Sequence, residues 1–136
     1  MTAATAPPGT RALHLTEAGG VRAIMADGLI PMIGPRAGDI GESEDRVHLF
    51  PDAESLIGGL GWVTDAFGDD VALSLLEADV SGMAVLSGAD SGLAGYEIAV
   101  RETIPPDRLR LLCEDVLSLT ENAIRELIRG GDGPSP

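Results

Sequence analysis

Two histidines and one glutamate stand out because each lies within a short apolar, strand-like segment of the sequence. His14, His48 and Glu97 are each flanked on both sides by apolar or aromatic residues. A polar side chain buried without a partner costs about 1–3 kcal/mol, so apolar strands gain from such residues only where they face a cleft. The pattern therefore indicates a site to which three strands contribute.

His14 and Thr16 lie two positions apart in the first of these segments. In a strand this spacing puts both side chains on the same face, where they could hydrogen-bond a ligand hydroxyl or amide. A second interpretation needs no ligand: His14 could be satisfied near the end of the strand, and Thr16 could cap a following helix. The spacing alone is compatible with both.

The second and third segments present a similar choice. His48 shares a strand face with Arg46 and Phe50, and as a lone histidine it could equally be structural or exposed. Glu97 follows a glycine-rich stretch, where the rim of a cleft is common. There its carboxylate could grip a hydroxyl or stabilise a developing positive charge, although a single glutamate on a strand can also simply be solvated.

Arg36 lies in a long segment rich in glycine, proline and acidic residues. Its guanidinium could bind two oxygens of a phosphate if that segment folds over the cleft. It could equally pair with one of the nearby acids Asp39, Glu42 or Glu44. The sequence leaves the two possibilities open.

Several other chemistries lack a signature in this chain. There is no glycine-rich phosphate-binding motif, and two isolated histidines with one distant cysteine give no zinc spacing. Cys113 follows an apolar run and is predicted to be a core residue, since a free cysteine behaves as a small hydrophobe. We therefore expect no bound metal.

Charge and composition limit the classes of partner. The 136 residues are 44% apolar, which suffices for one domain with a real core. The net charge is −13, and all nine basic residues are arginine, so nucleic acid and anionic membranes are disfavoured as partners. No apolar run reaches the ~20 residues of a membrane helix, and the start lacks the pattern of a secretory signal, so we expect a soluble, cytoplasmic protein.

The coarse order of elements predicts an α+β fold. Residues 1–10 and 130–136 are expected to be disordered, and residues 11–129 to form a single domain. Thr16 is the expected N-cap and Gly28 the expected C-cap of the first helix, while Asp52 is expected to cap the second. The expected strands are 11–16, 47–50, 71–80, 96–103 and 108–112, and the expected helices are 16–28, 52–67 and 114–129.

A series of short motifs, taken in order, resembles the ADP-ribosyltransferase-like superfamily, in particular small bacterial domains that begin with a His-x-Thr strand. The resemblance covers roughly residues 11–113 and depends on the order and spacing of the motifs. The motifs are Leu13-His14-Leu15-Thr16, Ala26-Asp27-Gly28-Leu29-Ile30-Pro31, Ile33-Gly34-Pro35-Arg36, Val47-His48-Leu49-Phe50, Leu76-Glu77-Ala78-Asp79-Val80, Tyr96-Glu97 and Ile104-Pro105-Pro106-Asp107-Arg108-Leu109.

The resemblance implies a split, strongly bent pair of β-sheets with flanking helices, a C-terminal helix, and NAD as co-substrate between the sheets. His14 and Thr16 would hold the dinucleotide, with His14 on the ribose next to adenine. Glu97 would hold the nicotinamide ribose and assist transfer, and Phe50 would offer the nicotinamide a stacking surface. His48 stands where many relatives carry Tyr or Ser.

The function that follows is mono-ADP-ribosylation of a macromolecule, a protein with a basic surface in the first instance, by a bacterial or phage toxin or effector. Two other classes stay open. One is a non-enzymatic acidic binding protein, either an inhibitor or a nucleic-acid mimic, although the acids are interspersed with apolar residues and form no long stripe. The other is a degenerate relative that binds NAD without catalysis.

Overall fold

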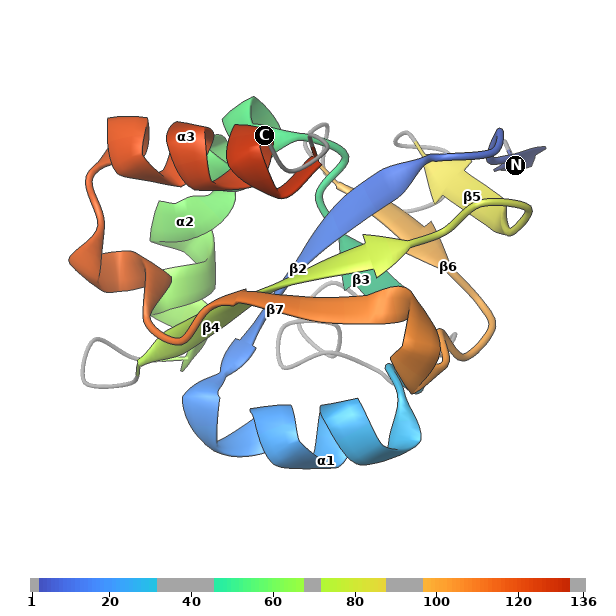
Figure 1. Cartoon of the computed structure of the whole chain (residues 1–136), viewed down its shortest axis with the longest axis horizontal. Coiled ribbons are helices and arrows are strands. Elements are labelled where there is room, and N and C mark those ends of the chain that lie inside the picture. The colour runs from blue at the N-terminus through green and yellow to red at the C-terminus, as the bar shows by residue number, and fades with distance from the viewer. Residues whose placement is uncertain (1–2, 32–45, 68–71, 88–96, 133–136) are drawn as a thin grey trace.

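Two small antiparallel sheets and three helices make up the part of the chain that the computed structural model describes, which comprises residues 3–31, 46–67, 72–87 and 97–132 (Figure 1). The four-stranded sheet has the order β1 (Ala3–Thr5), β5 (Ala84–Ser87), β6 (Ile98–Val100), β3 (Val47–Leu49). The three-stranded sheet has the order β2 (Arg11–Glu17), β4 (Leu73–Asp79), β7 (Leu109–Cys113). The helices are α1 (Val21–Asp27), α2 (Ala53–Phe67) and α3 (Glu121–Asp132), with 3-10 turns η1 (Ala18–Gly20), η3 (Pro106–Arg108) and η4 (Val116–Ser118).

Strand β4, at the centre of the three-stranded sheet, is buried on both faces, and each face of the sheet contacts a different core. Alternation along β2 sends Ala12 toward one core and Leu13 toward the other. The first core joins the two sheets and includes Ala12, Ala78, Val47, Leu49, Val100 and Leu109. The second lies against α2 and α3 and includes Leu13, Leu15, Phe50, Leu56, Leu75 and Ile124. This two-sided burial explains why β4 is apolar over most of its length.

The two sheets are joined at one point by a pair of backbone hydrogen bonds. Leu13 and Phe50 form an isolated antiparallel bridge, in which each N–H donates to the other's carbonyl oxygen at 2.8 Å. Leu13 belongs to β2, and Phe50 directly follows β3. The bridge therefore brings the segment around His14 against the segment around His48.

The predicted α+β class is confirmed, and most predicted elements are found within a few residues of their expected bounds. Gly28 ends α1 with φ of 94°, and the Asp52 carboxylate accepts a hydrogen bond from the Ser55 N–H at 2.8 Å, as an N-cap does. Of the helices in these described ranges, none is long and apolar enough to span a membrane.

Three expectations were wrong. Residues 3–5 form β1, which pairs with β5, although the whole of residues 1–10 was predicted to be disordered. Thr16 is not an N-cap, because β2 continues through Glu17 and Gly20 precedes the helix. The last helix begins at Glu121 instead of residue 114 and continues to Asp132, beyond the predicted end of the domain at residue 129.

Candidate functional site

His14 lies in β2 with its ring directed at the neighbouring segment of the other sheet. Its Nδ1 is 2.9 Å from the carbonyl oxygen of His48. A carbonyl can only accept, so Nδ1 carries the proton and donates, which leaves Nε2 of the neutral ring as an acceptor. The Leu13–Phe50 bridge positions this contact, because it aligns β2 with the end of β3.

The environment of His14 favours the neutral ring. Burial lowers the pKa of His14 below its ordinary value of 6.5, because the charged imidazolium would lose its hydration. The hydrogen bond to the His48 carbonyl acts in the opposite direction, while the charge of the nearby His48 lowers the pKa further. A neutral His14 with a fixed tautomer can accept a hydrogen bond from a hydroxyl group near pH 7.

His48 and Glu97 form the second contact of the site. His48 lies in β3 opposite Ala99 of β6, and Glu97 lies two residues before Ala99, so both side chains are on the same face of the four-stranded sheet. The Nδ1 of His48 is 3.5 Å from Oε2 of Glu97. The Glu97 side chain is only 5% exposed, whereas that of His48 is 26% exposed.

Three residues from distant parts of the sequence thus meet at the junction of the two sheets. His14 contacts the His48 backbone, and His48 in turn pairs with Glu97. The arrangement provides a hydrogen-bond acceptor on a neutral imidazole, a second imidazole, and a buried carboxylate. We refer to His14, His48 and Glu97 as the junction site.

The other predicted site residues have different surroundings. Thr16 is partly buried on the same face of β2 as His14, and its register partner in β4 is Ser74. Phe50 is 5% exposed and packs in the core against α2 and α3. This packing explains why an aromatic residue stands at this position, and no ligand is needed to explain it. Arg36 lies outside the described residues.

Arg46 is a further candidate for this site, and nothing in the sequence pointed to a role for it. It lies just before β3, two residues from His48 and therefore on the same face of that segment. Arginine is rarely buried, yet Arg46 is only 7% exposed. The alternation of residues 46, 48 and 50 predicts that Arg46 shares a face with His48. Nothing in the sequence indicates that Arg46 is buried.

A second buried acid lies away from the junction site and has a structural explanation. Glu77 of β4 is 2% exposed, and its Oε1 accepts from Arg11 at 3.0 Å and from Arg110 at 2.9 Å. Arg110 of β7 is the register partner of Glu77, and Arg11 of β2 lies two residues from the register partner of Glu77 on that strand. Glu77 therefore ties β2, β4 and β7 together, because a buried carboxylate needs such charge compensation.

Within residues 3–31, 46–67, 72–87 and 97–132, no group of three or more His, Cys, Asp or Glu side chains could hold a metal ion. Cys113 is a free thiol, partly buried and packed against the second core.

Comparison with known proteins assigns the chain to no family. No family model matches the chain, and no curated protein shows significant similarity to it.

Proposed function

We infer that the chain is a small ADP-ribosyltransferase-like domain that transfers ADP-ribose from NAD to a macromolecular acceptor, in the first instance a protein. The observation that carries this proposal is the junction site, where His14, His48 and Glu97 meet although 83 residues separate the first from the last. The order of short motifs that resembles the superfamily supports it independently. A role as a bacterial or phage toxin or effector would follow from that chemistry.

The chemistry of the junction site suits a dinucleotide with two riboses. The neutral His14 ring offers Nε2 as an acceptor for a ribose hydroxyl. The buried guanidinium of Arg46, two residues from His48, supplies positive charge on the His48 face, where a diphosphate would need it. Phe50 adds no stacking surface to this fit, because its ring is part of the core.

Glu97 is the residue to which we assign the reactive role. Transfer breaks the bond between nicotinamide and ribose, forms a bond from the ribose to the acceptor nucleophile, and releases the acceptor's proton. Positive charge develops on the ribose as nicotinamide departs. A buried carboxylate beside it stabilises that charge more strongly than a solvated one would, because water screens it less.

Two alternatives remain distinct from this proposal. The net charge of −13 favours an acidic binding protein that blocks a basic surface without catalysis. A degenerate relative would use the junction site to bind NAD alone. Two experiments, a thermal melt with NAD and a measurement of nicotinamide release, separate the three.

The deciding experiment is a thermal melt of wild type and His14→Ala with and without millimolar NAD. NAD at about 100 times its dissociation constant would stabilise the folded protein by about 2.7 kcal/mol. We expect wild type to shift and His14→Ala to lose the shift. If neither protein responds to NAD, the transferase and the degenerate-relative proposals both fail, and the acidic binder takes their place.

Glu97→Gln then separates catalysis from binding. We expect it to retain the NAD-dependent shift but to lose about 100-fold or more of nicotinamide release, because the carboxylate acts on the developing charge. Glu102→Gln removes a charge from an exposed residue just after β6 and should leave the rate unchanged. If NAD binds but wild type releases no nicotinamide with any acceptor preparation, the degenerate-relative interpretation is correct.

A further inference from the structure

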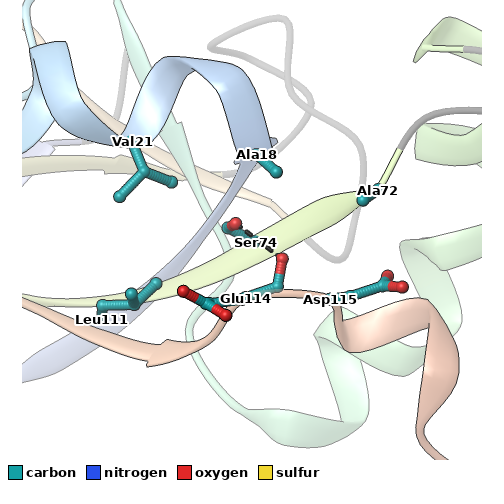
Figure 2. A pocket seen from close by; sticks show the side chains of 7 residues that line it. All are labelled: Ala18, Val21, Ala72, Ser74, Leu111, Glu114 and Asp115. Carbon is teal, nitrogen blue, oxygen red and sulfur yellow. Dashed lines mark hydrogen bonds between the residues drawn. The ribbon is translucent and has the colours of Figure 1, made fainter.

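A surface hollow of about 290 Å³ lies between the start of α1 and the edge of the three-stranded sheet (Figure 2). Ala18 and Val21 line it from η1 and α1, and Ser74 lines it from β4. Leu111 of β7 pairs with Leu76, which in turn pairs with His14. The hollow therefore opens on the same face of this sheet as His14, but over β4 and β7 instead of β2.

The walls of the hollow are apolar and exposed to solvent. Figure 2 shows Val21 on one side and Leu111 on the other. Leu111 is 36% exposed, although its register partner Leu76 is completely buried. Met25, one turn along α1 from Val21, is also 36% exposed. A ligand with an aliphatic portion would remove this apolar surface from water.

Ala72, Glu114 and Asp115 complete the lining, and hydrogen bonds hold the backbone of Glu114 and the side chain of Asp115. The Ser74 hydroxyl donates to the carbonyl oxygen of Glu114 at 2.8 Å, which fixes the backbone just after β7. The Asp115 carboxylate accepts from the Leu117 N–H at 3.2 Å, whereas the exposed Glu114 side chain extends toward Leu111 (Figure 2). Of the seven described residues that line the hollow, two are acidic and none is basic.

We propose that this hollow binds the side chain of an arginine or lysine on a partner protein. Such a side chain has an aliphatic stem that packs on apolar surface and a cationic head that stays with polar groups. The stem fits between Val21 and Leu111, and the head then meets Glu114. The surplus of 13 negative charges on the chain steers a basic partner toward this surface.

This assignment stands independently of the transferase proposal. The hollow is defined by β4, β7 and the start of α1, and it contains none of His14, His48 and Glu97. Failure of NAD to bind would leave the hollow as the docking point of an acidic binder. Failure of a basic side chain to bind would leave the junction site unaffected.

The test is a titration of the ¹⁵N-labelled full chain, followed by NMR, with three blocked tripeptides: Gly-Arg-Gly, Gly-Lys-Gly and Gly-norleucine-Gly. The norleucine peptide keeps the aliphatic stem without the charge. We expect saturable shifts for the amides of Ala72, Leu111 and Asp115 with the arginine or lysine peptide, at a dissociation constant on the order of 1 mM. The norleucine peptide should bind several-fold more weakly.

Two variants probe the two halves of the hollow. Glu114→Gln should weaken binding of the cationic peptide about two- to fivefold, as expected for an exposed ion pair. Glu102→Gln, the same charge change at an exposed residue outside the hollow, should not. Leu111→Ser should weaken the cationic and norleucine peptides alike, and because Leu111 is partly exposed the fold should tolerate it.

The proposal is overturned if the shifts fail to saturate, if they spread evenly over the acidic surface, or if Glu114→Gln and Glu102→Gln weaken binding equally. Each of these results would indicate nonspecific attraction of cations. A thermal melt of every variant verifies that it is folded before the titrations are compared.

Discussion

The proton on Nδ1 of His14 is held by a single contact, the hydrogen bond to the His48 carbonyl oxygen. That contact fixes the ring and its tautomer, and burial keeps the ring neutral. The acceptor role that we assign to Nε2 depends on both effects. Protonation of His14 would convert Nε2 from an acceptor into a donor.

The lowered pKa of His14 makes stability depend on pH. Because the folded-state pKa lies below the unfolded value of about 6.5, the unfolded chain binds more protons in the window beneath that value. The contribution of His14 to stability is therefore present above pH 6.5 and is lost as pH falls from about 7 toward the folded-state pKa. We expect a slope of up to about 1.4 kcal/mol per pH unit, measured by urea unfolding between pH 7.5 and 5.

His14→Gln supplies the control for this dependence. The glutamine amide can still donate to the His48 carbonyl but cannot titrate. The variant should therefore show a smaller slope over the same window. Equal slopes for both proteins would mean that His14 titrates alike in the folded and unfolded chains.

The individual polar residues were predictable from sequence to the extent that they interrupt apolar strands. His14, His48 and Glu97 were identified in this way, and the structure brings them together. Phe50 was not distinguishable as a core residue, because alternation gives the face of a strand but not what covers that face. The burial of Arg46 could not be predicted from the sequence for the same reason.

At the level of elements, the errors have local physical causes. Residues 3–5 carry no hydrophobic pattern, and β1 forms through backbone pairing with β5, a nonlocal contact that composition cannot indicate. Thr16 has the chemistry of an N-cap, but seven register pairs with β4 extend β2 through Glu17 and shift the start of the helix to Val21. In both places a nonlocal strand pairing prevailed over the local sequence signal, which was the absence of a pattern at residues 3–5 and a capping preference at Thr16.

Gly28 was predicted correctly because a tight helix end has a specific residue requirement. It closes α1 at φ of 94° and ψ of 177°, a conformation that residues with a side chain rarely adopt. A Cβ here would come within 2.5 Å of the carbonyl oxygen of Ile104, in the segment that pairs with Leu29. We expect Gly28→Ala to lower the free energy of unfolding by about 2–4 kcal/mol in urea melts, from strain and crowding together.

Gly58→Ala is the matched control within another helix. A Cβ at Gly58 of α2 meets nothing within 4 Å. Alanine has the higher helix propensity, so this change should stabilise the protein by about 0.5–1 kcal/mol. If Gly28→Ala changed the free energy of unfolding as little as Gly58→Ala does, the end of α1 could not approach the Ile104 carbonyl as closely as described.

For the molecule as a whole, the excess of acidic residues determines how stability responds to salt. The chain has 22 acidic residues against 9 basic ones. Several arginines are already engaged: Arg11 and Arg110 hold Glu77, and Arg125 of α3 pairs with Glu54 of α2 at 2.6 Å. The surplus acids therefore repel one another in the compact state more than in the expanded unfolded chain.

Added salt should consequently stabilise this protein. Raising NaCl from 10 to 200 mM at pH 7.5 shortens the screening length from about 30 Å to less than 10 Å, which weakens repulsion between distant surface charges more than attraction within close pairs. We expect a gain of about 1 kcal/mol, or a rise of about 4 °C in Tm, measured by thermal melts. Near pH 4.2, where the net charge is close to zero, the rise should disappear. A Tm that falls with NaCl at pH 7.5 would instead mean that close pairs such as Arg125 with Glu54 outweigh the repulsion.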